Sequence, residues 1–473
     1  MGNAMKKTLA AQGIFLTGER LISLVSQAGA VILISRFLGQ EIFGQYAVVL
    51  TWTALFQMIA NFGLSECISR EIGKDVEGSR RLVSHSLMLT VIIAAISSFV
   101  MFLAASLAQY PSRQMAILQL AILILFPAST IATCRAVLIG HKRVEYMLWV
   151  VAVETLIFLP AAIYCALHGM DLFYLIGAII ASKMIAALLA IVIVHRVASP
   201  ILWRFDRKVM SGLFFITVPF GLNSLIVFPF VRFDIILLSK MTTMAAVGVY
   251  SAAAKLMEVF LVVPIVFFAI MLPQVARHMT HMTGESLDRL QLSFERYFMI
   301  VIPIGVGAIC FAQPAILLLY GAAFVDAVLL LKIHMVAYLI LTIDVAFSLV
   351  LKAAGFQKND LHVSIVTAAS NILLNLILIP PYGVIGASLA LVSAVLVSAL
   401  LRFGFLSRYV VSLKWMSCIQ GPLLLSVGVM TTIVLLNDLV PFPVLGILYV
   451  VCYAGLAVAF LNAGRTLLKE GIG

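Results

Sequence analysis

The amino-acid sequence predicts an all-α integral membrane protein with about fourteen transmembrane helices. Of its 473 residues, 63% are hydrophobic and only 11% are charged, whereas a soluble domain carries about 25% charged residues. Apolar runs reach about twenty residues, which is enough to cross the hydrocarbon as a helix. The strands of an outer-membrane barrel would instead alternate over about ten residues. Helices are therefore the expected element, with no soluble domain of consequence.

The apolar runs divide into two groups of six spans followed by a final pair. They cover residues 13–37, 43–67, 84–108, 115–139, 146–168, 172–193, 210–238, 247–272, 297–320, 328–351, 361–381, 384–406, 415–436 and 442–461.

The distribution of lysine and arginine predicts the orientation, because cytoplasmic loops are enriched in positive charge. Clusters on one side fall at residues 6–7, 70–81, 135–143, 196–208, 277–296, 352–358, 402–414 and 465–469. The opposite side holds only Arg36, Arg113, Lys240 and Lys332. Both termini are therefore expected in the cytoplasm. The net charge of +11 comes from basic residues in short clusters between apolar segments, which this topology explains. We therefore expect no nucleic-acid partner.

Two short residue patterns recur in the sequence and suggest that the two groups of six helices are repeats. Segment 35–46, with Ser-Arg, seven residues and Gly-Gln-Tyr, reappears 204 residues later in segment 239–250 as Ser-Lys, seven residues and Gly-Val-Tyr. Gly140 with Arg143 three residues on is echoed by Gly355 with Lys358. Because six is even, the repeats would be parallel, and folds of that kind bind substrate between their halves.

The predicted domain organisation follows the repeats. An N-lobe covers residues 1–195, a cytoplasmic linker 196–209, a C-lobe 210–408, and an appendix of two helices 409–473.

Charged side chains inside the spans are candidate functional residues, because a charge in the bilayer usually has a partner or faces a watery cavity. Glu19 and Arg20 are interpreted as interfacial residues that reach towards the headgroups, with a role in substrate binding as the alternative. Glu154 and Lys183 lie at comparable depths, and either form an internal salt pair or line a cavity.

The second half carries a denser set of polar residues around its first two helices. Lys255 and Glu258 are three residues apart and can share a helix face. The preceding span contains two charges and several helix-breaking or polar residues: Arg232, Asp234, Pro219, Gly221, Pro229 and Asn223. Broken helices often line the site of secondary transporters. The alternative to a functional cavity is a charge network that holds the two helices together.

Asn371 and Asn375 are one turn apart in a later span. Hydrogen bonding between helices is one interpretation. The other is a cation site completed by Asp234, since oxygen ligands suit a hard ion.

Motifs for other chemistry are missing from the sequence. It has no phosphate-binding loop and no metal-binding histidine motif, so no cofactor is expected and transport would run on an Na⁺ or H⁺ gradient or on the gradient of the substrate. The cysteines show no paired spacing, and we expect free, buried thiols. They are Cys67, Cys134, Cys165, Cys310, Cys418 and Cys452.

Segment 36–46, reading RFLGQEIFGQY, resembles the Wzx-type polysaccharide and O-antigen flippases of the multidrug/oligosaccharidyl-lipid/polysaccharide exporter (MOP) superfamily, which also contains the MATE transporters. Four further stretches are similar to that family: 61–64 (NFGL), 248–256 (GVYSAAAKL), 319–321 (LYG) and 371–387 (NILLNLILIPPYGVIGA).

The resemblance implies a bacterial inner-membrane flippase that moves an undecaprenyl-pyrophosphate-linked oligosaccharide to the periplasmic leaflet by alternating access, in lipopolysaccharide biosynthesis. Its partners would be the bilayer and other polysaccharide assembly proteins. Arg232 and Lys255, with Arg36 and Lys183, would meet the anionic pyrophosphate, and Asp234 and Glu258 would balance their charge. In the related lipid II flippases a carboxylate and asparagines contribute to a sodium site, and Asp234, Asn371 and Asn375 stand in similar places.

Three alternatives remain open. A cation-coupled multidrug antiporter of the same superfamily usually has twelve helices and a less cationic interior. A membrane polysaccharide polymerase or ligase would carry a large periplasmic loop, whereas the longest hydrophilic connection here, 277–296, is predicted to be cytoplasmic. A structural scaffold would have little reason to keep charges on a broken helix.

Overall fold

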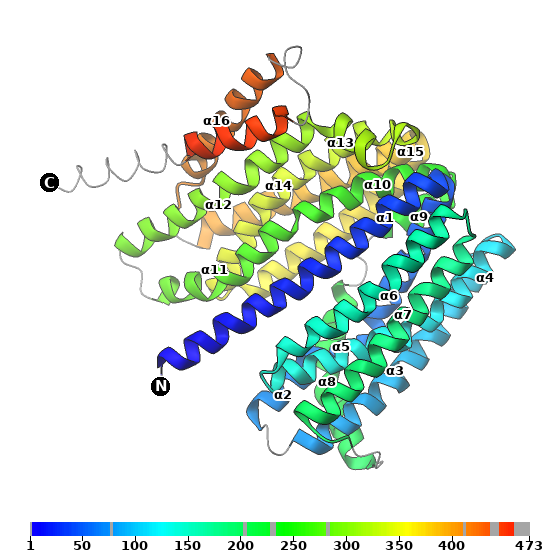
Figure 1. Ribbon diagram of the computed structural model, residues 1–473. Coiled ribbons are helices and arrows are strands. Elements are labelled where there is room, and N and C mark those ends of the chain that lie inside the picture. The colour runs from blue at the N-terminus through cyan, green and yellow to red at the C-terminus, as the bar shows by residue number, and fades with distance from the viewer. Residues whose placement is uncertain are drawn as a thin grey trace. The chain divides into compact units, whose positions relative to one another are not determined.

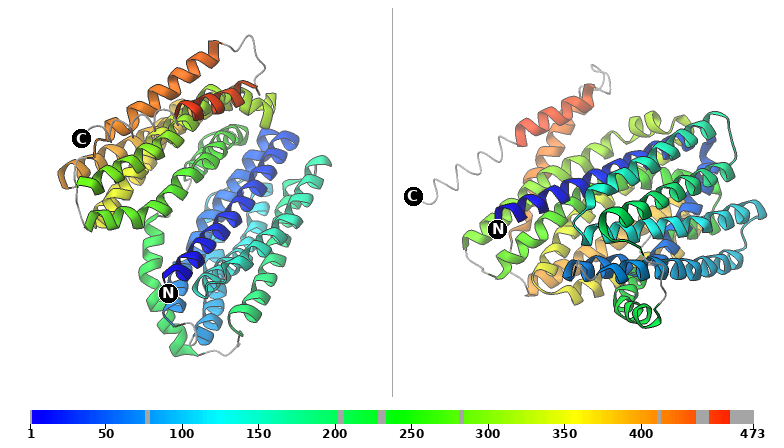
Figure 2. Two further views of the ribbon diagram at one scale, coloured as in Figure 1. Left: turned by 60° about the vertical axis from the view of Figure 1, so that its left-hand side comes forward. Right: turned by 60° about the horizontal axis from the view of Figure 1, so that its bottom comes forward.

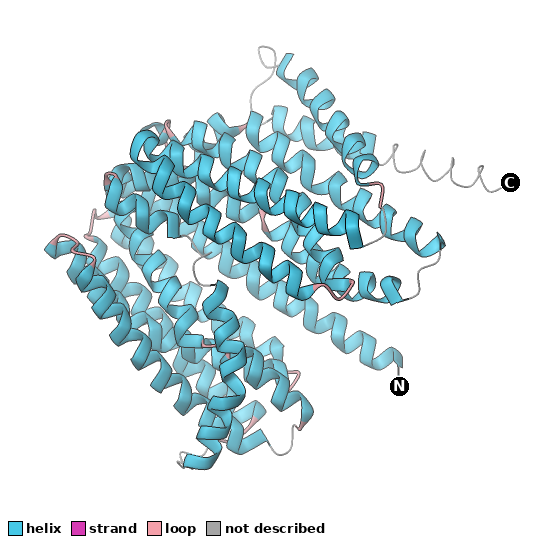
Figure 3. Ribbon diagram, turned by 180° about the vertical axis from the view of Figure 1, so that it is seen from behind, coloured by secondary structure: helices cyan, strands magenta, loops and turns pink. Residues whose placement is uncertain are grey.

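The computed structural model of the chain describes residues 2–75, 79–201, 206–227, 233–280, 284–409, 413–435 and 444–457. Within these ranges the regular elements are all helical, joined by short loops (Figure 3). The chain divides into two compact units, Met1–Gly248 and Val249–Gly473.

Over its described residues, the first unit contains nine α-helices and the start of a tenth, α10, most of which are labelled in Figure 1. They are α1 (Gly2–Asn61), α2 (Leu64–Lys74), α3 (Ser79–Leu107), α4 (Ser112–Ala121), α5 (Leu125–Gly140), α6 (Met147–Leu167), α7 (Leu172–Ile193), α8 (Arg207–Val227) and α9 (Phe233–Met241). Helix α7 packs against both α5 and α6, and α1 packs against α6 (Figure 2). Helices α8 and α9 belong to this compact unit, and the sequence predicts them as the start of the C-lobe.

The second unit begins within α10 (Met244–Phe260). Its other helices are α11 (Val262–Thr280), α12 (Gly284–Cys310), α13 (Ala312–Leu319), α14 (Ala327–Ala353), α15 (Gln357–Tyr409), α16 (Trp415–Leu435) and the apolar helix Val444–Ala457. Helix α14 packs against α11, α12 and α15, and α12 packs against α16.

The described helices account for the predicted membrane crossings. Ten stretches are long and apolar enough to span a bilayer, counted over the described residues. Two of the ten, Ser26–Lys74 and Gln357–Arg408, are long enough for two crossings each. Counting these two stretches twice gives twelve crossings over the described residues. Adding α8 and the helix Val444–Ala457 gives fourteen, in agreement with the prediction of about fourteen helices.

Glycines break the two longest helices where the sequence predicts a loop. Gly39 (φ 81°, ψ 178°) interrupts α1 and Gly383 (φ 54°, ψ −131°) interrupts α15. Positive φ is accessible to glycine without the steric cost that a side chain brings. Gly386 then lies so near the preceding segment that an added β-carbon would be 2.0 Å from the carbonyl oxygen of Leu378. Each long helix therefore comprises two spans.

Several predicted boundaries were wrong. The span 43–67 is interrupted at Phe62 (φ 36°) and Gly63 (φ 68°), and the chain continues as α2, so Arg70 and Lys74 lie in a helix. The hydrophilic connection 277–296 is also mostly helix, because α11 runs to Thr280 and α12 begins at Gly284.

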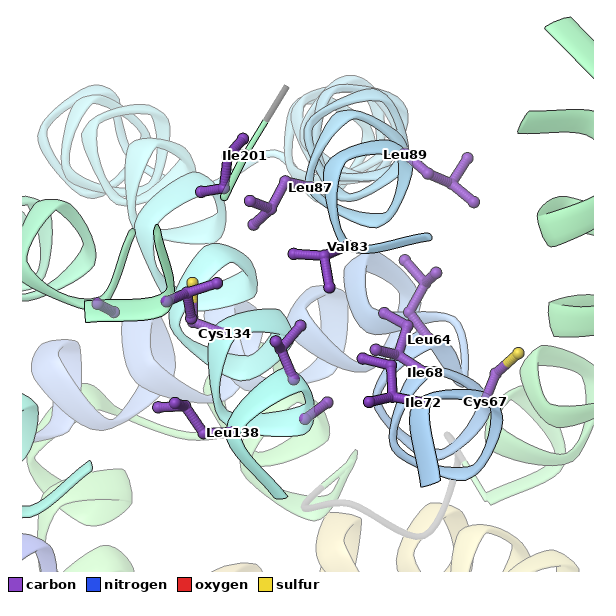
Figure 4. Close-up of a cluster of buried hydrophobic side chains, with 14 of the residues drawn as sticks. Leu64, Cys67, Ile68, Ile72, Val83, Leu87, Leu89, Cys134, Leu138 and Ile201 are labelled. Atoms are coloured by element: carbon purple, nitrogen blue, oxygen red, sulfur yellow. The ribbon is translucent and has the colours of Figure 1, made fainter. Parts of the chain in front are cut away.

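A buried apolar cluster holds α2, α3 and α5 together in the first unit (Figure 4). Its labelled side chains are Leu64, Cys67, Ile68, Ile72, Val83, Leu87, Leu89, Cys134, Leu138 and Ile201. The six cysteines are free, as predicted. The prediction that all are buried was wrong for Cys310 and Cys452, which are exposed on their apolar helices.

Candidate functional site

Lys255 and Glu258 form an ion pair on α10. The Lys255 ammonium lies 3.0 Å from Glu258 Oε2, and 26% and 36% of the two side chains are exposed. Their three-residue spacing places them on one face, as the sequence indicated. The pair sits in the apolar stretch Met244–Arg277. It therefore keeps a cation, partly neutralised by its neighbour, within a candidate membrane span.

Lys183 of α7 and Glu154 of α6 form a second ion pair. Lys183 Nζ lies 2.6 Å from Glu154 Oε1, and each side chain is 26% exposed. Residues on the same face of α7, Ile179, Ala186 and Ala187, are buried. Lys183 therefore lies on the packed side of its helix and still retains an exposed fraction. The salt pair that the sequence allowed is present.

Glu19 is not the interfacial residue that the sequence predicts. It is buried on α1, and its Oε2 lies 3.0 Å from Arg135 Nη2 of α5. Arg135 was counted with the loop charges, but it lies inside α5. The Arg20 side chain lies outside the described residues. Arg36 is exposed on α1, three residues before the break at Gly39.

Asp234 lies in the first turn of α9, where its Oδ1 accepts a hydrogen bond from the Ile235 N–H at 2.9 Å. A carboxylate is favourable at this end of a helix. Its side chain is half-buried. Arg232, which precedes it by two residues, lies outside the described residues, as do Pro229 and the side chains of Pro219 and Asn223.

Asn371 and Asn375 are joined within α15. Asn375 Nδ2 donates to the Asn371 carbonyl oxygen at 2.8 Å and to Asn371 Oδ1 at 3.1 Å. The bonds therefore run within one helix, whereas the sequence suggested a bond between helices. Asn375 is fully buried, and its Oδ1 has no hydrogen-bond partner in the described part of the chain. A buried acceptor without a donor is rare and needs an explanation.

A buried charge cluster on α14 and α15 was missed from the sequence. Arg402 lies between Asp344 and Asp360, and all three are buried. Lys352 adds a second cation, 3.2 Å from Asp360 Oδ2. From the sequence, Arg402 is predicted to be one of the cytoplasmic charges, in a group with Arg408 and Lys414. The available signal was Asp344, an acidic residue in an otherwise apolar run.

Comparison of the sequence with models of known protein families identifies the family of this chain. Residues 9–279, more than half of the chain, match the family model described as polysaccharide biosynthesis protein. The chain belongs to this family. No curated protein sequence matches the chain.

Solved structures share the fold. A structure titled "Lipid II flippase MurJ, inward closed conformation" has a TM-score of 0.77 at 14% identity, and the match covers 96% of this chain and 99% of that one. An inward-facing multidrug resistance MATE family transporter of the MOP superfamily has a TM-score of 0.67 at 16% identity, covering 81% and 93%. A MOP superfamily transporter from Pyrococcus furiosus has a TM-score of 0.55 at 17% identity, covering 85% and 94%.

The fold and the family together establish a multi-pass integral membrane protein with a transporter fold of the MOP type. The resemblance read from the sequence is confirmed at that level.

Proposed function

We propose that the protein is a flippase that moves a lipid-pyrophosphate-linked oligosaccharide across a bacterial inner membrane by alternating access. The observation that carries this proposal is the likeness to the lipid II flippase structure over 96% of the chain, within a polysaccharide biosynthesis family. The MATE structure is matched over only 81% of the chain. This difference favours a flippase over the antiporter alternative.

The chemistry of such a substrate fits the intramembrane cations. A glycan headgroup is too polar to cross hydrocarbon unaided, and its pyrophosphate carries negative charge. Lys255 and Lys183 each hold a partly exposed ammonium beside a carboxylate. A carboxylate partner keeps the resting charge low and can be exchanged for a phosphate. We assign pyrophosphate binding to Lys255 and Lys183, with Glu258 as the exchanging partner of Lys255.

Arg36 and Arg232 complete the proposed set of phosphate-binding residues, since arginine donates to phosphate in pairs. Ion coupling is assigned to Asp234, Asn371 and Asn375, with either Na⁺ or H⁺ as the coupling ion. The unsatisfied Oδ1 of Asn375 supports an oxygen-ligated cation. Both termini are proposed to be cytoplasmic, as the lysine and arginine distribution indicates. Other proteins of polysaccharide assembly are the proposed partners.

Flipping in proteoliposomes tests the proposal. The purified protein is reconstituted with a lipid-pyrophosphate-linked oligosaccharide, an Na⁺ or H⁺ gradient is imposed, and exposure of the glycan to an external glycan-cleaving enzyme is followed. Gradient-dependent exposure is expected, and the effective gradient identifies the ion. If no lipid-linked glycan becomes exposed and small cationic drugs move in response to a gradient, the flippase proposal is wrong and the protein is an antiporter.

A membrane polymerase or ligase is the alternative from another class. It would lengthen or transfer the glycan, so the same liposomes analysed for glycan mass separate the two. An unchanged glycan is the expected result.

A further inference from the structure

Arg402 is buried in the second half of α15 and reaches two aspartates on different helical segments. Its Nε donates to Asp360 Oδ1 at 2.8 Å, and its Nη1 donates to Asp344 Oδ2. Asp360 lies in the first turn of α15, before the break at Gly383, and Asp344 lies on α14. One guanidinium therefore joins three helical segments.

Serine hydroxyls complete the hydrogen bonding around this arginine. Ser398, one turn before Arg402, donates to Asp344 Oδ1 at 3.0 Å. Arg402 Nη2 donates to Ser364 Oγ of the first half of α15 at 2.9 Å. All three guanidinium nitrogens are used. A lysine at this position would supply one point of donation and could not span both carboxylates in the same way.

The cluster is electrically balanced. The two carboxylates, of Asp344 and Asp360, are matched by Arg402 and by Lys352, whose Nζ is 3.2 Å from Asp360 Oδ2. The Lys352 side chain is 38% exposed, whereas those of the other three are 5% to 8% exposed. Only the Lys352 end of the cluster is open to the surroundings.

Separating these segments would leave a charge buried without its partner, which is among the most unfavourable changes that a protein interior can undergo. The Lys255–Glu258 pair differs in this respect, because both residues belong to α10 and the pair does not join two helices. The Arg402 cluster therefore opposes relative movement of α14 and the two halves of α15.

We propose that Arg402, Asp344 and Asp360 are positioning residues that hold α14 and both halves of α15 as one block throughout the transport cycle. The movements of transport then occur around this block and not within it. This inference rests on the proposed transport function for its role, but the rigidity of the block is measurable without any transport.

The test measures a distance within the block by pulsed electron paramagnetic resonance. Spin labels are placed on Lys358→Cys and Ser407→Cys, two exposed sites near the ends of α15. The exposed Cys310 and Cys452 are replaced by serine, and the buried cysteines are left in place. Labelled protein in liposomes is compared without a gradient, with an Na⁺ gradient, with an H⁺ gradient, and with a lipid-linked oligosaccharide present.

We expect one narrow distance distribution that is the same in all four conditions. A distribution that shifts or splits when a gradient or the glycan is added would overturn the proposal, because the block would then open during the cycle. The proposed function is tested separately by the flipping assay. If that function is wrong, no glycan becomes exposed, and this result does not depend on the measured distance distribution.

The variants Arg402→Ala and Arg402→Lys test the cluster itself. We expect both to broaden the distribution and to lower the flipping rate per folded protein by about tenfold or more. Lys414→Ala, which removes an exposed cation from the following connection, is the matched control and should leave both unchanged. If Arg402→Ala does not fold, Ser364→Ala removes a single hydrogen bond and should broaden the distribution. Narrow distributions and normal flipping in all the cluster variants would refute the assignment.

Discussion

Gly44 and Gly248 pack against each other's helices in a reciprocal way. A β-carbon added to Gly44 would lie 1.8 Å from the carbonyl oxygen of Met244, and one added to Gly248 would lie 2.1 Å from that of Gln40. Gly44 and Gly248 are 204 residues apart, and so are Gln40 and Met244. The two copies of the repeated segment thus contact each other through equivalent atoms.

Close approach of this kind needs a residue without a side chain. A glycine at a helix crossing lets two helix backbones approach closely in a membrane protein. Gly44 lies near the start of the second half of α1, and Gly248 lies near the start of α10. The glycine in the repeated segment is therefore required by packing.

Gly44→Ala and Gly248→Ala should each lower the free energy of unfolding by about 3 kcal/mol or more, because the methyl group would overlap a backbone carbonyl that cannot move aside. Gly177→Ala is the matched control, since a β-carbon there meets nothing within 4 Å. In a helix interior that change should be neutral or stabilise by about 1 kcal/mol. Thermal unfolding of the detergent-solubilised variants gives the comparison. Equal melting temperatures for Gly44→Ala and Gly177→Ala would contradict the predicted crossing.

Gly221 of α8 accommodates the ring of Phe62, which occupies the break between α1 and α2. A β-carbon on Gly221 would lie 2.5 Å from the Phe62 ring. Gly221→Ala should therefore destabilise the protein by about 1–3 kcal/mol through overpacking. Adding Phe62→Ala to Gly221→Ala should restore part of that loss, because the overlap disappears. A double-variant cycle measures the coupling energy. Additive effects would show that the two residues do not interact.

The sequence predicts the crossings well because membrane thickness sets the length of an apolar run, whereas the break at Phe62 and Gly63 was not predicted. The positions of Gly39 and Gly383 could also be predicted, since glycine marks turns between spans. The partners of internal charges could not be predicted in the same way. Arg402 and Asp344 are 58 residues apart in the chain, and hydropathy does not say which helices are neighbours.

The same limit applies to the partners of two arginines. Arg135 and Arg402 stand near the ends of apolar runs, where a count of positive charges assigns them to loops. The structure places both in helices beside carboxylates, Glu19 and Asp344 respectively. Proximity to the end of a span therefore does not show whether an arginine is paired with a carboxylate of another helix.

The second recurring pattern, Gly140 with Arg143 and Gly355 with Lys358, does not pair structurally equivalent residues. Gly355 (φ 87°) ends α14, and its structural counterpart at the end of α5 is Lys142 (φ 58°), not Gly140. The following residues make the same bond in each case, from Arg143 N to Leu138 O at 2.8 Å and from Phe356 N to Leu351 O at 2.9 Å. The helix ends match, although the glycine is kept in only one of them.

Substitutions in the Lys183–Glu154 pair distinguish a structural role of Lys183 from a role in substrate binding. If Lys183 meets the pyrophosphate, Lys183→Gln should lower the flipping rate by about tenfold, equivalent to about 1.4 kcal/mol. Glu154→Gln leaves the cation in place and should reduce flipping far less. Both variants lose the same ion pair, so thermal unfolding serves as the control for a shared structural loss. Equal reductions in flipping that follow equal losses of stability would indicate a structural pair only.

Asp234→Asn tests the coupling role of the carboxylate at the start of α9. The amide keeps an oxygen that can accept the Ile235 N–H bond, so folding should be preserved, but the negative charge that favours a cation is lost. We expect flipping to lose its dependence on the Na⁺ or H⁺ gradient and to fall to the rate seen without a gradient. Asp171→Asn is the control, because that carboxylate pairs with Arg113 in a partly exposed ion pair, 2.7 Å apart. Flipping assays over a series of ion gradients make the measurement. Unchanged gradient dependence in Asp234→Asn would place the coupling ion elsewhere.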